Sequence, residues 1–146
     1  MCYSVYIGTT EKQEVGKFVP NETNIYFEEL SEEEEKGIRP KFKNPFLYYV
    51  GSDTNCSCGL AFDSEKLDNQ DEQDNKKSPT KLLEFINERT DREDLEFYCC
   101  WEGEWSDPVE SKIELDIRTI SLDKNYFGPV LKQYIIFKKK GKKNFG

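Results

Sequence analysis

Six short segments rich in aromatic and β-branched residues, separated by polar turns, constrain the fold of this chain more than any other feature. In segments 2–8 and 113–117, apolar and polar residues alternate, which is typical of a strand with one face in a core. The run 46–50 is apolar throughout and predicts a central strand buried on both faces. The remaining expected strands are 25–27, 95–102 and 131–137.

One segment carries a strong helix signal. Ser78 followed by Pro79 is typical of a helix start, and the next residues repeat apolar side chains at helical spacing. We therefore expect the main helix over 79–89, with a buried stripe made of Leu82, Phe85 and Ile86.

A shorter helix is predicted after Ser31, which has the capping-box spacing to Glu34, and Gly37 is expected to be its C-terminal cap. These elements do not follow a regular βαβ alternation. We therefore expect an α+β fold: a single domain over 1–146, with an antiparallel or mixed sheet of five to six strands and the one main helix packed on one face.

The net charge of −8 is distributed unevenly along the chain. Five of its lysines fall in the last nine residues, so the rest of the chain is more acidic than the total indicates. An acidic body repels nucleic acid and attracts a basic protein. We expect residues 138–146 to form a solvated basic tail, and 64–77, where Leu67 is the one strongly apolar residue, to form a flexible loop.

Targeting signals are not evident in the sequence. Residues 1–20 lack the pattern of a signal peptide, and no segment has the apolar length of a membrane span. We therefore expect a cytoplasmic protein that does not engage a membrane and whose cysteines are reduced.

The chain contains five cysteines and no histidine. Cys-His pairs, Ser-His-Asp triads and most zinc enzymes depend on an imidazole, so its absence excludes much of the usual catalytic repertoire. The composition therefore argues against an enzyme, although catalysis by carboxylates or thiolates remains open.

A thiolate site is one hypothesis. Cys56 and Cys58 share one glycine-ended loop, and Cys2 and Cys100 would complete an all-cysteine zinc site if their strands lie beside it. A redox pair is less favoured, because the small ring of a Cys-x-Cys disulfide is strained. The favoured interpretation is that the thiols are independent and no cofactor is bound, with Cys99 in the core and Cys100 pointing away from it.

The leading hypothesis is a binding surface around Trp105. An exposed tryptophan beside acidic residues is typical of a surface that engages a basic partner. The alternative is that the ring folds back over the edge of the core. The chain is therefore interpreted as a small acidic binding protein without catalysis, resembling an immunity or inhibitor protein, whose partner-binding residues are Trp105, Glu102, Glu104 and Asp107.

Four motifs occur together in the chain: Met1-Cys2 with Tyr6, Tyr49-Val50-Gly51-Ser52, Cys56-x-Cys58-Gly59 and Cys100-Trp101-Glu102-Gly103. Together they resemble a group of small uncharacterised bacterial proteins. That resemblance implies a bacterial single-domain protein in which Cys2, Cys56, Cys58 and Cys100 lie together, and it brings no known activity.

Overall fold

The computed structural model of the chain describes residues 3–16, 19, 23–54, 56–60, 77–119 and 130–139. Within them, six strands form one mixed sheet in the order β2-β3-β1-β4-β6-β5. Neighbouring strands are antiparallel except β5 and β6, which run parallel. The predicted α+β fold is confirmed. The strands are β1 (Tyr3–Thr9), β2 (Ile25–Glu28), β3 (Phe46–Ser52), β4 (Leu95–Trp101), β5 (Ser111–Leu115) and β6 (Gln133–Phe137).

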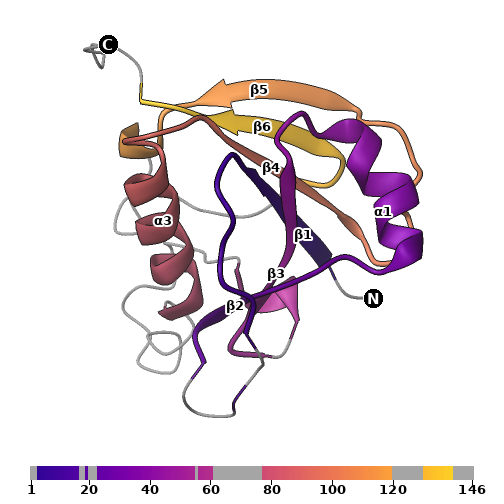
Figure 1. The fold of residues 1–146 in the computed structure, drawn as a ribbon, viewed down its shortest axis with the longest axis horizontal. Helices are drawn as coiled ribbons and strands as arrows, with labels where there is room; N and C mark the ends of the chain where they lie inside the picture. Colours follow the sequence, from indigo (N-terminus) through magenta and orange to yellow (C-terminus); the bar gives the residue numbers. More distant parts are fainter. Residues whose placement is uncertain are drawn as a thin grey trace.

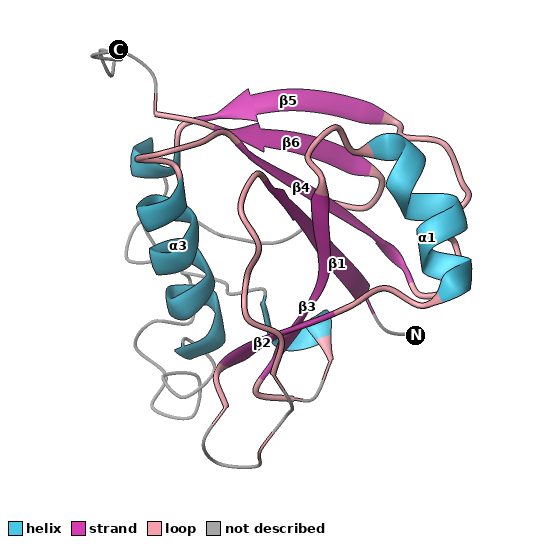
Figure 2. Ribbon diagram, viewed as in Figure 1, coloured by secondary structure: helices cyan, strands magenta, loops and turns pink. Residues whose placement is uncertain are grey.

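Two helices lie on opposite sides of this sheet, as Figure 1 and Figure 2 show. The main helix predicted over 79–89 is confirmed as α3 (Lys77–Arg89), and the short helix is α1 (Glu32–Ile38). Neither of these described helices is long and apolar enough to cross a membrane. Three single-turn segments complete the described helical structure: η1 (Arg39–Lys41), η2 (Ser57–Leu60) and η5 (Ile117–Thr119).

The larger core lies between the sheet and α3. Ile7 of the central strand β1 packs in one cluster with Leu82 and Ile86, and all three side chains are fully buried. Phe85 is half-buried and lies against the ring of Phe27, with 4.9 Å between the ring centroids. The predicted apolar stripe therefore faces the sheet, and its i, i+4 pair forms the deepest part.

A second core lies on the opposite face, where α1 and the segment 103–110 cover the sheet. Tyr6, Tyr98 and Cys100 are fully buried there. Cys99 lies in the larger core and Cys100 points to the other face, as the alternation predicts. Both thiols are buried because each face of the sheet has its own covering layer.

Helix α1 is held close to the backbone of Trp105. The capping box between Ser31 and Glu34 is confirmed, but Gly37 is not the C-terminal cap, which is Arg39. A Cβ atom at Gly37 would lie 2.5 Å from the carbonyl carbon of Trp105, so the glycine permits this contact. The Nζ of Lys41 donates to the carbonyls of Gly37 and Trp105, both at 2.7 Å, and closes the junction.

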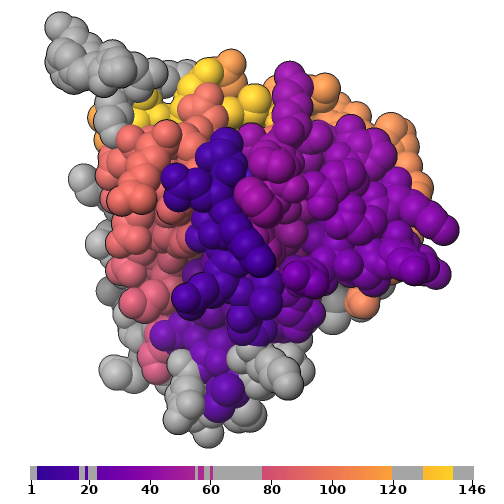
Figure 3. Space-filling model, viewed as in Figure 1, coloured from indigo at the N-terminus to yellow at the C-terminus, as the bar shows by residue number. Residues whose placement is uncertain are grey.

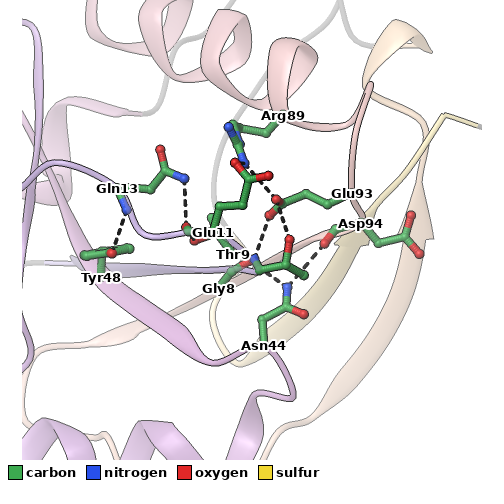
Figure 4. A network of polar contacts seen from close by, with 10 residues as sticks. Gly8, Thr9, Glu11, Gln13, Asn44, Tyr48, Arg89, Glu93 and Asp94 are labelled. Atoms are coloured by element: carbon green, nitrogen blue, oxygen red, sulfur yellow. Dashed lines mark hydrogen bonds and ion pairs between the residues drawn. The ribbon is translucent and has the colours of Figure 1, made fainter.

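A polar network joins the C-terminus of α3 to the end of β1 (Figure 4). The backbone N–H and hydroxyl of Thr10 donate to the carboxylate of Glu93, which also binds Arg89 at 2.8 Å. The side-chain amide of Asn44 donates to the carbonyl of Gly8 at 2.9 Å. These contacts connect elements that are distant in sequence, so we interpret the network as structural.

Segment 10–16 continues from β1 across the molecular surface. In the space-filling view its indigo atoms lie between those of α3 and those of residues 30–50 (Figure 3). The N–H of Gln13 donates to the hydroxyl of Tyr48 at 2.8 Å, and the N–H of Gly16 donates to a carbonyl of β2 at 3.1 Å. The segment is therefore tied to both β3 and β2.

The expected basic tail, 138–146, begins with two lysines that form ion pairs. The Nζ of Lys138 lies 2.6 Å from a carboxylate oxygen of Glu114, and that of Lys139 lies 2.5 Å from Asp91. The rest of the tail lies outside the described residues. These two ion pairs therefore connect the end of β6 to β5 and to the turn after α3.

The expected flexible loop over 64–77 lies almost wholly outside the described residues. Its last residue, Lys77, is the first residue of α3. The prediction of flexibility therefore stays a prediction for 64–76, and the helix begins two residues earlier than expected.

Candidate functional site

One row of side chains crosses the α1 face of the sheet from edge to edge. The strand register makes each member the direct cross-strand neighbour of the next, and the rings of Tyr6 and Tyr49 contact each other with 5.9 Å between their centroids. An acidic residue stands at one end, four tyrosines fill the middle and a lysine stands at the other end. In spatial order the row is Glu28 (β2), Tyr49 (β3), Tyr6 (β1), Tyr98 (β4), Tyr134 (β6) and Lys112 (β5).

A cavity of about 350 Å³ opens at the acidic end of this row. We call it the acid-aromatic cavity. Its walls come from four neighbouring strands or their ends and from the start of α1. They combine three carboxylates, three aromatic rings and two serine hydroxyls, and no described lining residue is basic. The lining residues are Ser4, Tyr26, Glu28, Ser31, Glu34, Tyr49, Glu102 and Trp105.

Glu34 is fixed in place at the start of α1. Its Oε1 accepts the backbone N–H of Ser31 at 3.0 Å, and its Oε2 accepts the hydroxyl of Tyr6 at 2.5 Å. The capping box thus points one carboxylate at the tyrosine row. A carboxylate held by two donors keeps lone pairs for a further donor, so Glu34 remains able to receive a ligand.

Tyr26 lies flat against the sheet because its cross-strand neighbour is a glycine. A Cβ atom at Gly51 would lie 2.1 Å from the Tyr26 ring, so the ring occupies the space of the missing side chain. Burial raises the pKa of the Tyr26 hydroxyl, and the negative charge of Glu28 raises it further. Tyr49 has a raised pKa for the same first reason, with Glu102 among the smaller causes.

Trp105 is half-buried and packs against the second core. This is the arrangement of the alternative interpretation, in which the ring folds back over the edge of the core. Its indole Nε1 is buried and has no hydrogen-bond partner among the described residues. One side of the residue supports α1 and another lines the cavity, so Trp105 connects the site to the fold.

The four predicted partner-binding residues separate into two pairs. Trp105 and Glu102 line the acid-aromatic cavity, whereas Glu104 and Asp107 are not among its lining residues. Asp107 instead forms an ion pair with Lys132 at 3.0 Å. The structure therefore brings two of the four residues to one cavity, and partner binding by any of them stays a prediction.

The sequence interpretation missed Glu28, Glu34, Tyr26 and Tyr49. Tyr26 and Glu28 are two residues apart in β2, which places them on one face, but their approach to Tyr49 depends on strand pairing. Glu34 was interpreted only as a helix-capping residue. A search for acidic and aromatic residues with the same strand parity would have found the β2 pair but not its partners.

Cys99 and Cys100 lie on opposite faces of the sheet. Cys100 is fully buried, and burial raises the pKa of its thiol to about 12. Such a thiol is protonated and unreactive at neutral pH. Cys56 is half-buried in the loop after β3, with its Sγ 3.4 Å from the hydroxyl oxygen of Thr54. Cys56, Cys99 and Cys100 form no disulfide.

The zinc hypothesis depends on groups that are only partly described. Cys2 and the side chain of Cys58 lie outside the described residues. Among the residues that the structure describes, no group of three or more Cys, Asp or Glu is placed to hold a metal ion. The three carboxylates of the acid-aromatic cavity do not form such a group, and the zinc site stays a prediction.

The basic end of the tyrosine row borders a second cavity, of about 700 Å³, lined in part by Lys41, Lys43 and Lys112. The ammonium group of Lys41 donates hydrogen bonds to two backbone carbonyls. The α1 face thus carries negative charge at one end of the row and positive charge at the other. A cationic ligand is attracted to the acidic end, and an anionic ligand to the basic end.

Comparison of the chain with protein-family models, with curated proteins and with solved structures gives no match. The resemblance to small bacterial proteins therefore stays a prediction. The function has to be argued from the geometry of the site.

The tyrosines of the α1 face predict a sharp response to alkaline pH. Burial raises the pKa of each of Tyr6, Tyr26, Tyr49, Tyr98 and Tyr134, and hydrogen bonds to carboxylates add to the effect at Tyr6 and Tyr134. A raised folded-state pKa contributes stability that is fully present below the unfolded value of about 10 and is lost as the pH rises above it.

We expect tyrosinate absorbance and loss of the circular dichroism signal to appear together in one transition above pH ~10, because these rings ionise as the chain unfolds. Ionisation of most of the eight tyrosines near pH ~10 in a still-folded chain would contradict their burial.

Proposed function

We propose that this chain is a binding protein that engages a basic protein partner by receiving a cationic side chain in the acid-aromatic cavity. The observation that carries the proposal is the lining of that cavity: three glutamates and three aromatic rings around about 350 Å³, without a basic residue among the described lining. Two of the residues expected from the sequence to bind a partner, Trp105 and Glu102, contribute to it.

The two kinds of lining residue act on a cation in different ways. Carboxylates attract it by charge and accept its N–H groups in short, charge-assisted hydrogen bonds. The faces of tyrosine and tryptophan rings attract it through their negative quadrupole. A lysine or arginine side chain can use both interactions at once, whereas a neutral side chain of the same size can use neither fully.

The same lining favours binding over catalysis. The raised pKa values of Tyr26 and Tyr49 keep both hydroxyls protonated at neutral pH, so neither is available as a general base. The buried thiol of Cys100 is likewise protonated. We expect a cytoplasmic protein. We also expect it to bind no nucleic acid, because its acidic surface repels phosphate.

Titration with a small cation tests the proposal without knowledge of the partner. Ethylguanidinium carries the end group of arginine, and ethylurea is its neutral counterpart of nearly the same shape. The probe is the indole N–H signal of Trp105 in nuclear magnetic resonance spectra. Trp101 is an internal control, because it stacks on Tyr3 at 4.7 Å, and its strand parity places it on the opposite face.

We expect ethylguanidinium to shift the Trp105 signal with a dissociation constant on the order of 1 mM and to leave Trp101 unchanged. Ethylurea is expected to bind at least about tenfold more weakly. Equal effects of the two compounds, or equal shifts of both indoles, would show that the cavity does not select a cation.

A further inference from the structure

The hydrogen-bond pattern of β5 determines which of its backbone groups face the edge of the sheet. The N–H of Ser111 donates to the carbonyl of the residue before β6 at 3.3 Å, and the carbonyl of Leu115 accepts the N–H of Lys138 at 3.0 Å. Because successive residues of a strand point these groups to opposite edges, Lys112 and Glu114 direct theirs away from β6. No strand of the described part of the chain lies beyond β5.

The side chains of β5 are self-complementary about Ile113. Lys112 and Glu114 flank it on one face of the sheet, and Ile113 points to the other. Ile113 is 38 % exposed and is one of the few large apolar side chains at the surface of the described residues. In an antiparallel pair of β5 strands centred on Ile113, each Lys112 lies opposite Glu114 of the second copy.

We propose that two copies of this chain associate through their β5 strands, antiparallel and in the register that places Ile113 opposite Ile113. In this register Lys112 and Glu114 of the second copy form a hydrogen-bonded pair, which exchanges two backbone N–H···O bonds. The pair occurs twice, because the contact has twofold symmetry. The two Ile113 residues form a non-hydrogen-bonded pair, the kind in which side chains lie closest.

The internal ion pair of Glu114 is compatible with this contact. Its Oε2 lies 2.6 Å from Lys138, and a carboxylate accepts several donors, so Lys112 of the second copy joins an existing pair. A pair of five-residue strands is small beside the roughly 1,200–2,000 Å² that a standard interface buries. The dimer is therefore transient and depends on protein concentration.

Sedimentation velocity over a concentration series tests the contact. We expect the mean mass to rise from 17.2 kDa toward twice that value as concentration increases. The variant Lys112→Glu places two glutamates opposite each other and is expected to weaken association at least about tenfold, because like charges directly opposite repel. The double variant Lys112→Glu/Glu114→Lys exchanges the charges, restores complementarity and is expected to recover association.

Two further variants make the test specific. Lys12→Glu makes the same charge change at an exposed residue outside β5 and is expected to associate like the unmodified chain. Ile113→Lys places two cations at the twofold axis and is expected to abolish association, with circular dichroism confirming the fold. A chain that stays monomeric at every concentration, a dimer unaffected by Lys112→Glu, or a double variant without recovery would overturn the proposal.

Discussion

Replacement of Glu96 by leucine is expected to lower the free energy of unfolding by about 4 kcal/mol, because it leaves one buried and two partly buried donors without an acceptor. The Glu96 carboxylate is only 4 % exposed. It accepts the backbone N–H groups of Lys43 and Asn44, at 2.8 and 2.6 Å, and the hydroxyl of Tyr134. Equilibrium unfolding in urea measures the change.

Two variants control for this effect. Glu88→Leu removes a glutamate from the exposed side of α3 and is expected to change stability by less than about 0.5 kcal/mol. Adding Tyr134→Phe to Glu96→Leu removes one orphaned donor and is expected to restore about 1 kcal/mol. A cost below about 1 kcal/mol for Glu96→Leu would show that the loop before β3 does not depend on this carboxylate.

Gly37→Ala is expected to destabilise the protein by about 2 kcal/mol, against the helix propensity of alanine. Alanine is the better helix former by about 1 kcal/mol, but its Cβ would meet the Trp105 backbone at 2.5 Å. Helix α1 or the segment 103–110 must then move, which displaces one wall of the acid-aromatic cavity. Thermal unfolding and the Trp105 indole signal report the two consequences.

Gly16→Ala is the matched control. Apart from its chain neighbours, no atom of the described residues lies within 4 Å of a Cβ placed on Gly16, so the same substitution is expected to be neutral or slightly stabilising there. If Gly37→Ala stabilised the protein as much as propensity predicts, the close contact between α1 and Trp105 would be refuted.

Local sequence patterns predict the elements of this fold but not their pairing. The six strands and two helices follow from alternation, helical spacing and capping residues. Ser78 illustrates the limit, because its hydroxyl bonds to the carbonyl of Asn24 and to the N–H of Asp53. Its role is therefore tertiary, and α3 begins before it. The parallel pairing of β5 with β6 is likewise not encoded in either strand alone.

The second core is hidden from sequence analysis by the composition of α1. Four glutamates in its first turn are typical of a solvated helix, and only Gly37 and Ile38 of α1 are buried. The helix nevertheless covers Tyr6 because Glu34 accepts the hydroxyl of that tyrosine. A polar helix that packs through one isoleucine, Ile38, one hydrogen bond and one glycine contact leaves no hydrophobic periodicity to detect.

The candidate site could be predicted only in part, because some of its residues are close in sequence and others are brought together by the fold. Glu102 and Trp105 are three residues apart, and their acidic and aromatic neighbourhood is visible in the sequence. Glu28 reaches the cavity from β2 and Glu34 from α1, and these depend on sheet order. Residues contributed across strands can be recognised only once the register is known.

The central claim is that carboxylates of the acid-aromatic cavity bind a cation, and a pair of charge-neutralising variants tests it most directly. Glu28→Gln/Glu102→Gln removes two charges from the cavity lining, and Glu104→Gln/Glu110→Gln removes two from nearby positions outside it. At 0.15 M salt the Debye length is about 8 Å, so carboxylates that line the cavity act on the ligand more strongly than carboxylates outside the lining.

The affinity for ethylguanidinium is the quantity to compare. We expect Glu28→Gln/Glu102→Gln to lower it at least about tenfold, and Glu104→Gln/Glu110→Gln to change it less than about twofold. Equal losses in both double variants would show that the cation responds only to the overall acidity of the chain, and cation binding by the cavity would be contradicted.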